Sequence, residues 1–333
     1  MDRSETTRTA ATEAHDGAAG RMSRRTVLGG AALVAAAGTV GRLVGPELRA
    51  LGSRLDGPAQ VTARATRIDP PDPPPPPGSY VDGARYVALY GHPGSRVLGA
   101  LGEQGVAATV ERARLMATTY VGFGRPVVPA FEILASVASS VAGADGDYSN
   151  EFGVDEFRPY VDAAAANGFH CVFDLQPGRA RFPDQAREYA PLWRFPHVSI
   201  ALDPEWRVNA PAIPGGGRIG SVDGSEVNET VDYLDAVVRL HRLPRKMLIV
   251  HQFTPSMITN KQLIRGTSNV QVVLHMDGFG PLLLKRGSYD RMVADLPAGA
   301  LTGWKNFFDE DSPTPTPSQT LANDPRPMYV SFQ

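Results

Sequence analysis

The sequence contains a single cysteine, and this scarcity limits the chemistry available to the chain. Cys171 is the only cysteine among 333 residues, so an intramolecular disulfide framework and a zinc site built from several cysteines are both excluded. Cys171 lies in an apolar run, where a buried and unreactive thiol is expected rather than a nucleophile. Any reactive group in this chain must therefore be sought among other residue types.

The sequence also lacks an excess of charge of either sign. Lys and Arg total 33 against 35 Asp and Glu, which gives a formal net charge of -2. No segment is dominated by basic residues, so nucleic acid is not expected as a partner. A hydrophobic content of 42% and a charged content of 20% are typical of a soluble globular protein, and the length is sufficient for a large core.

The N-terminal region has the composition of an export signal. Residues 1–21 are polar and show no apolar periodicity, which predicts a disordered N-terminus, and Met22 offers an alternative start. In residues 22–41, Ser23-Arg24-Arg25 precedes an apolar run, which resembles a twin-arginine export signal. The run is shorter than the roughly 20 residues that span a bilayer. We expect an exported, extracytoplasmic protein that is secreted or associated with the membrane or cell wall, and an uncleaved N-terminal membrane tether stays open.

Residues 42–79 are predicted to be a linker that ends in a run of prolines. Consecutive prolines favour an extended polyproline II rod that has no packed core of its own. The linker is therefore interpreted as a spacer, and residues 80–333 as the folded domain.

From residue 80 onward the sequence alternates short apolar runs with helical patterns, which predicts an α/β fold. Eight strands alternating with helices favour a parallel (β/α)8 barrel of the TIM type. A doubly wound open sheet is the competing fold, but no Gly-x-Gly-x-x-Gly turn follows any strand. The predicted strands are 86–90, 126–133, 170–175, 198–203, 247–253, 270–276, 300–306 and 328–332, and the predicted helices are 106–119, 154–167, 183–193, 225–241 with Ser225 as N-cap, and 289–296.

The fourth predicted strand ends in two carboxylates, Asp203 and Glu205. Side chains alternate along a strand, so both acids lie on one face if strand geometry continues to Glu205, with Cα atoms about 6.5 Å apart. Carboxylates at such a separation raise each other's proton affinity and can divide into an acid and a base or nucleophile. In isolation the pattern also fits a strand end that caps a turn before Pro204.

Other strands deliver polar or aromatic residues at the same end. In a barrel the carboxyl ends of the strands and the loops that follow them form the active site. Burying these groups without partners would be costly, so we expect them to meet one another, water or a ligand. The additional residues are Glu132, Asp174, Gln176, Trp206, His251, His275, Asp277, Trp304, Lys305 and Asn306.

Two resemblances accompany these motifs. The segment Ile200-Ala201-Leu202-Asp203-Pro204-Glu205 resembles the Asp-x-Glu strand end of barrel-fold glycoside hydrolases, including the family 25 muramidases. That family also has an Asp on its first strand, whereas here the first strand ends in Tyr90-Gly91-His92. Over residues 80–333 the chain is similar to exported barrel-like proteins of unassigned function from high-GC bacteria, on segments 85–94, 222–228 and 303–307.

The leading hypothesis is an exported glycosidase that acts on a carbohydrate or cell-wall polymer. Glu205 is the expected general acid and Asp203 its partner, with Asp174 and Asp277 in support. Substrate binding is assigned to Glu132, Gln176, Trp206, His251, His275, Trp304, Lys305 and Asn306.

Two alternatives stay open. One is a metal-dependent hydrolase in which Asp174, His251, His275 and Asp277 hold zinc or manganese, although no His-x-x-x-His or His-Glu-x-x-His spacing occurs. No cofactor is therefore predicted, and a divalent metal stays open. The other is a surface barrel that binds glycans without catalysis, because a fold does not fix a function.

Overall fold

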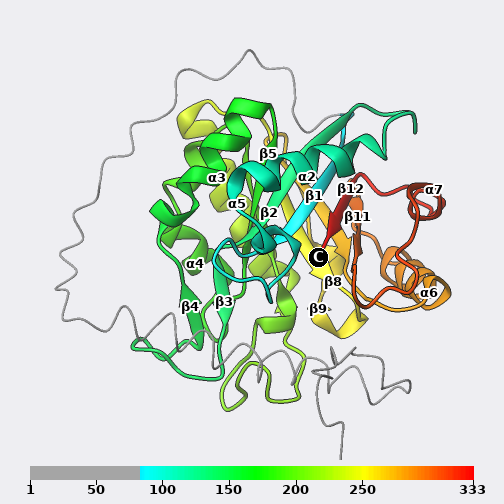
Figure 1. Ribbon diagram of the computed structural model, residues 1–333. Coiled ribbons are helices and arrows are strands. Elements are labelled where there is room, and N and C mark those ends of the chain that lie inside the picture. Colours follow the sequence, from blue (N-terminus) through cyan, green and yellow to red (C-terminus); the bar gives the residue numbers. More distant parts are fainter. Residues whose placement is uncertain (1–82) are drawn as a thin grey trace, which may run out of the picture.

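Eight parallel strands close into a barrel in the computed structural model, which describes residues 83–333 (Figure 1). The predicted disordered terminus (1–21), export signal (22–41) and linker (42–79) lie outside the described residues. Around the barrel each strand pairs with its neighbours in the order of the chain. The strands are β1 Arg85–Gly91, β2 Val127–Leu134, β5 His170–Leu175, β6 Val198–Leu202, β8 Lys246–Gln252, β10 Val270–Met276, β11 Leu301–Asn306 and β12 Tyr329–Phe332.

The predicted TIM-type barrel is confirmed, and its strands begin or end within two residues of the predicted positions. The second strand starts at Val127 rather than at Pro126, because proline has no backbone N–H to donate to the ladder. The carbonyl of Pro126 still accepts from the N–H of Arg85, at 2.8 Å. The fourth strand ends at Leu202, one residue before Asp203, where the backbone leaves the extended conformation.

The helices between the strands match the predicted positions with three differences. They are α2 Val106–Thr118, α3 Val154–Asn167, α4 Phe182–Glu188, α5 Gly224–His241, α6 Leu282–Val293 and α7 Pro317–Thr320. Helix α4 is shorter than predicted and is followed by a separate 3-10 turn, Leu192–Arg194, while α6 begins seven residues before the predicted start at 289. Ser225 was the wrong N-cap for α5, because Asp223 accepts from the N–H and the hydroxyl of Ser225 at 2.9 and 2.6 Å.

Several short elements lie at the carboxyl ends of the strands. A hairpin of β3 Ser136–Ala138 and β4 Ser149–Glu151 follows β2, and β7 Val222–Asp223 pairs with β9 Ile258–Thr259. The remaining 3-10 turns are Ala100–Glu103, Pro204–Trp206, Pro255–Met257 and Lys261–Leu263. No helix among residues 83–333 is long and apolar enough to cross a membrane.

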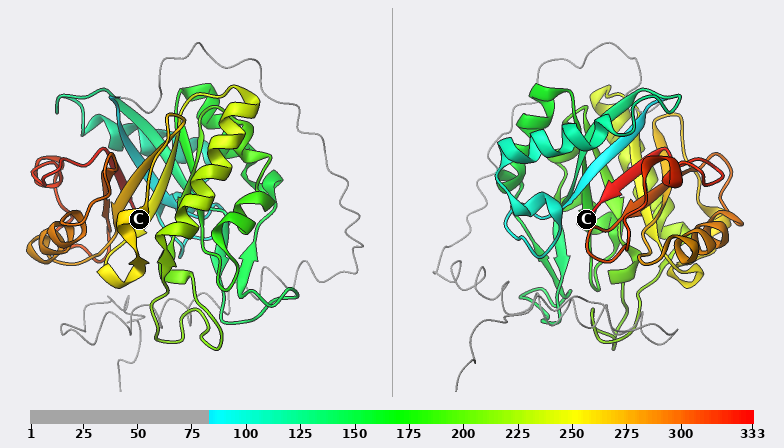
Figure 2. Two further views of the ribbon diagram at one scale, coloured as in Figure 1. Left: turned by 180° about the vertical axis from the view of Figure 1, so that it is seen from behind. Right: turned by 45° about the vertical axis from the view of Figure 1, so that its right-hand side comes forward.

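Two sets of buried side chains stabilise the barrel. The outward set of strand residues packs beneath the surrounding helices; Phe173 of β5, for example, contacts Phe157 of α3 and Trp193, with ring centroids 5.2 and 6.4 Å apart. The inward set is smaller and includes Ala88, Ala130, Val172, Ala201, Ile249 and Val273. Figure 2 shows α5 along the outside of the barrel, with α6 and α7 beside the last strands. Small inward residues leave room for larger polar side chains at one end of the barrel.

We expect Phe173→Ala to lower the free energy of unfolding by about 3–5 kcal/mol, because it leaves a cavity between β5 and the helices that cover it. Denaturant-induced unfolding measures the loss. Leu115→Ala is the matched control: its side chain is 66% exposed, so the expected change is under about 0.5 kcal/mol. Equal effects of the two substitutions would contradict the packing described above.

Candidate active site

The inward faces of the strands become polar toward their carboxyl ends. On β5 the inward residues are His170, Val172 and Asp174, and on β10 they are Val273 and His275, followed by Asp277. Tyr90 of β1 lies opposite Glu132 of β2 in the strand register, and His251 of β8 lies opposite His275. Polar side chains from β1, β2, β5, β8, β10, β11 and β12 therefore meet inside one end of the barrel.

His251 lies at the centre of this group and joins two carboxylates. Its Nδ1 is 3.0 Å from Oδ2 of Asp277, and its Nε2 is 2.9 Å from Oε1 of Glu132. A neutral imidazole has only one N–H. If both carboxylates are ionised, its unprotonated nitrogen would face a carboxylate oxygen, and both atoms would be acceptors. A doubly protonated imidazolium satisfies both contacts. The hydroxyl of Tyr329 donates to the second oxygen of Glu132, at 3.1 Å.

The ionisation of these three groups agrees with that geometry. Burial alone would lower the pKa of His251, but the charge of Asp174 and the hydrogen bonds with Asp277 and Glu132 raise it well above its ordinary value. Burial likewise opposes ionisation of Glu132 and Asp277, yet their contacts with His251 bring the pKa of each below its ordinary value. At neutral pH the triad therefore holds a buried cation between two anions.

Asp203 and Glu205 are both drawn toward the protonated state. Burial raises the pKa of Asp203 well above its ordinary value, and the charge of Asp174 adds to the rise. Burial also raises the pKa of Glu205 to about 8, with a further contribution from the charge of Asp277. Asp277 is therefore close enough for its charge to affect the pKa of Glu205. At neutral pH the ionised form of Asp277 and the protonated form of Glu205 are favoured.

The backbone places Glu205 differently from the sequence expectation. Strand geometry does not continue through Asp203, because residues Pro204–Trp206 form a 3-10 turn. Asp203 is the N-cap of that turn and accepts from the N–H of Glu205, at 3.3 Å. Gln176 donates to its other oxygen at 3.4 Å. The two acids thus share a site through a capped turn and not through strand alternation, and Glu205 is partly exposed whereas Asp203 is buried.

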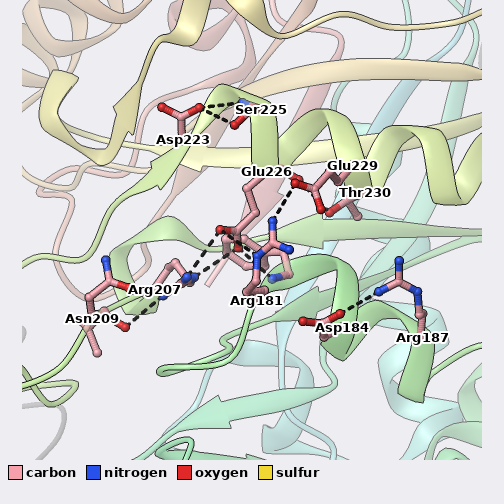
Figure 3. Close-up of polar contacts among 12 residues, drawn as sticks. Arg181, Asp184, Arg187, Arg207, Asn209, Asp223, Ser225, Glu226, Glu229 and Thr230 are labelled. Carbon is pink, nitrogen blue, oxygen red and sulfur yellow. Dashed lines mark hydrogen bonds and ion pairs between the residues drawn. The ribbon is translucent and has the colours of Figure 1, made fainter.

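The turn that carries Glu205 is fixed to the helices outside the barrel. Arg207 lies directly after the turn and forms a buried ion pair with Glu226 of α5, at 3.1 Å (Figure 3). Arg181 adds contacts with Glu226 and with Glu229, at 3.7 and 2.7 Å. Gly220 then crosses back and donates to the carbonyl of Glu205, at 2.7 Å. A Cβ atom at position 220 would lie 2.5 Å from that carbonyl oxygen, so only glycine fits at this position.

Tyr90 and Lys305 complete the wall opposite the acids. The hydroxyl of Tyr90 donates to Oδ2 of Asp174, at 2.9 Å. The Nζ atom of Lys305 lies over the ring of Tyr90, 3.5 Å from its centroid. Burial raises the pKa of Asp174, whereas the charges of His251 and Lys305 oppose the rise.

Two predicted site residues do not reach the site. Trp304 and Asn306 alternate with Lys305 on β11 and point out of the barrel, where the indole donates to the Asn306 amide oxygen at 2.8 Å. Trp304 is fully buried against Met276, Tyr289 and Met292. Grouping these residues by position at a strand end, without applying the alternation, gave them a role that the structure does not support.

The remaining predicted residues lie at or next to the group. His275 is inward but fully buried, and its Nε2 is 2.8 Å from the hydroxyl of Ser331. Gln176 contacts Asp203 as described, and Trp206 is 9% exposed within the 3-10 turn. Sequence reasoning missed Tyr90 and Tyr329. Tyr90 points inward near the carboxyl end of β1, where alternation could have identified it, whereas Tyr329 is the first residue of β12.

Two groups of side chains have the residue types of a metal site. Glu132, His251 and His275 offer ligand atoms that lie within 4.8 Å of one another, as do Asp145 and Asp147 of the loop between β3 and β4 together with Glu151 at the end of β4. In the first group Glu132 and His251 already form a hydrogen bond with each other. Of the four residues predicted as ligands, only the two histidines belong to it.

No family model matches this chain, and no curated protein sequence matches it. The site combines a partly exposed carboxyl whose pKa is raised, Glu205, with a carboxylate whose pKa is lowered, Asp277. Such a pair is used for general acid and base catalysis.

The raised pKa of Glu205 predicts how stability changes with pH. Between the ordinary carboxyl range and about pH 8 the folded protein holds a proton that the unfolded chain releases, so stability falls as pH rises and levels off above pH 8. Glu205→Gln should therefore raise the thermal unfolding midpoint by a few degrees at about pH 8 and hardly at all at about pH 5.

Glu111→Gln in α2 is the control for that measurement, because its side chain is 66% exposed. Its effect on the midpoint should be small and similar at both pH values. If Glu205→Gln also gave the same shift at both, the proton held by Glu205 in the folded state would be ruled out.

Proposed function

We propose that the protein is an exported glycoside hydrolase that acts on a carbohydrate or cell-wall polymer. The observation that carries the proposal is the opposed ionisation of Glu205 and Asp277 in one barrel mouth. Hydrolysis of a glycosidic bond requires one carboxyl that donates a proton to the leaving oxygen and one carboxylate that acts on the other side of the sugar. The carboxyl ends of barrel strands are the usual place for such a pair.

In this proposal Glu205 is the general acid. It is partly exposed at the mouth and protonated near neutral pH, so it can give its proton to the glycosidic oxygen as the bond breaks. Its turn is held by the Arg207–Glu226 ion pair and by Gly220, which fixes the direction of the carboxyl. Fixed placement of the acid is part of the catalytic effect, because misplacement by about 1 Å can cost on the order of 100-fold in rate.

Asp277 takes the role of the ionised partner. Its Oδ2 is bound to His251, while its Oδ1 is buried and has no hydrogen-bond partner among residues 83–333. That free oxygen is the atom available to attack the anomeric carbon or to deprotonate a water molecule. The sequence had assigned this role to Asp203, whose raised pKa fits a protonated donor better.

Glu205→Gln and Asp277→Asn should each lower the hydrolysis rate by about three orders of magnitude, because each removes one of the two required groups. The rate of reducing-sugar release from a panel of cell-wall and extracellular polysaccharides measures the effect. Asp290→Asn on the exposed face of α6 is the matched control and should retain the full rate.

The same panel separates the alternatives. A non-catalytic glycan-binding barrel predicts binding without turnover in the unsubstituted protein. A metal-dependent hydrolase predicts activity that a chelator abolishes and that returns with zinc or manganese. Full activity of Glu205→Gln would remove the acid assignment altogether.

His251 should set the pH range of activity through Asp277. Removing the imidazolium takes away the contact that holds the Asp277 pKa down, so a higher pH is then needed to ionise this carboxylate. We expect His251→Gln to move the acidic limb of kcat/KM upward by about one to two pH units.

His275→Gln is the matched control for that profile. The two imidazole rings lie 5.0 Å apart, but burial and the charge of His251 lower the pKa of His275 well below its ordinary value, so it carries no charge to lose. Its acidic limb should stay in place even if the rate changes. If the acidic limb of kcat/KM did not move in His251→Gln, His251 would not control the ionisation of Asp277.

A further inference from the structure

Lys305 differs from every other lysine in the chain. The sequence has four lysines, and three of them donate to protein oxygens: Lys246 to two carbonyls, Lys261 to a carbonyl and Asp295, and Lys285 to a carbonyl and Asp311. Lys305 is 4% exposed, yet within residues 83–333 its ammonium has neither a hydrogen bond nor an ion pair. Among the four lysines, Lys305 is the one whose donors are left for another partner.

The contacts of the Lys305 ammonium are with aromatic rings. Its Nζ lies 3.5 Å from the centroid of Tyr90 and 5.2 Å from that of Phe307. Cation–π contacts recover only part of the hydration that an ammonium loses when it is buried. The three N–H donors are therefore incompletely satisfied, and an anionic acceptor would satisfy them best.

The position of Lys305 points it at the proposed site. Its charge acts on Glu132, Asp174, Glu205 and Asp277, which come from four different parts of the barrel. The anions Glu132 and Asp277 are balanced by the cations His251 and Lys305, while Asp174, Asp203 and Glu205 favour the protonated state. A further negative group can therefore enter without facing a strongly negative site.

The surroundings of Lys305 also suit the ring of a sugar. Phe307 contacts the ring of Phe279, which is 41% exposed, and the two centroids are 5.8 Å apart in an edge-on arrangement. Asp311 holds both segments, since it accepts from the N–H groups of Gly280 and Phe307, each at 2.9 Å. Apolar ring faces beside the ammonium can pack against the C–H face of a saccharide.

We propose that the barrel mouth takes an acidic saccharide, with Lys305 binding its carboxylate beside the rings of Tyr90 and Phe307. This inference rests on the proposed function for the placement of the sugar between Glu205 and Asp277. It adds the class of substrate, a saccharide that carries a carboxyl group.

The test compares acidic oligosaccharides with their carboxyl-reduced forms, which differ only in that each uronic acid has become a neutral hexose. Dissociation constants are measured for the full chain carrying Glu205→Gln, so that turnover does not interfere. Reduction should weaken binding by about tenfold or more, as expected for the loss of a charge-assisted hydrogen bond. The probes are glucuronate and galacturonate oligosaccharides.

Lys305→Met in the same background should bring the acidic and reduced forms to within about twofold of each other. Arg242→Met is the control: it removes one positive charge from the exposed end of α5, at the opposite end of the barrel, and should keep the preference for the acidic form. Thermal unfolding of both variants confirms that each remains folded.

Several results would overturn the inference: equal binding of acidic and reduced forms, a preference that persists in Lys305→Met, or no binding of any acidic probe. Hydrolysis of neutral glycans without an acidic preference would leave the proposed function standing and remove only the inference. Binding of acidic saccharides that depends on Lys305, with no hydrolysis by the unsubstituted protein, would leave the inference standing and remove the proposed function.

Discussion

The arrangement of this site depends on one buried cation, the imidazolium of His251. Each of its nitrogens faces a carboxylate oxygen, at 2.9 and 3.0 Å, and no part of the side chain reaches solvent. A charge buried in this way is stable only while its partners stay ionised, so Glu132 and Asp277 are held as anions by the same contacts that hold His251 as a cation. Burial raises the pKa of the remaining acids, Asp174, Asp203 and Glu205, and neighbouring negative charge adds to the rise. The hydrogen bonds of one histidine thus set two of the five carboxyl groups apart from the other three.

The barrel supports this arrangement because the side chains that pack against the helices and the side chains that form the site lie on opposite faces of each strand. Outward residues bind the strands to the helices, and inward residues become polar only near the carboxyl ends. The Lys285–Asp311 pair fixes the loop after β11 and the Arg207–Glu226 pair fixes the loop after β6. These ion pairs lie outside the polar group but determine where Phe307 and Glu205 are placed. Precise positioning of a few side chains is therefore supported by contacts that take no part in the chemistry.

Much of the fold could be predicted from the sequence, because apolar runs alternating with helical patterns report directly on burial. All eight strands were found in this way, and the errors lay where local hydrogen bonds decide the boundary, as at Pro126 and at the Asp223 cap. The site was predicted less completely. Strand ends identified Asp174, Asp203, Glu205, His251, Asp277 and Lys305, but side-chain direction on β11 excluded Trp304 and Asn306. Which acid keeps its proton depends on contacts between β2, β8 and β10, and no local pattern in the sequence encodes that choice.

Tyr90 is the residue before the last one of β1, and its phenol has a consequence for the whole mouth. Its hydroxyl engages Asp174 while its ring face covers the ammonium of Lys305. A carboxylate at this position would neutralise Lys305 directly and leave it no capacity for an outside anion. The phenol instead donates to Asp174 and leaves the donors of Lys305 available to an anion that enters the barrel.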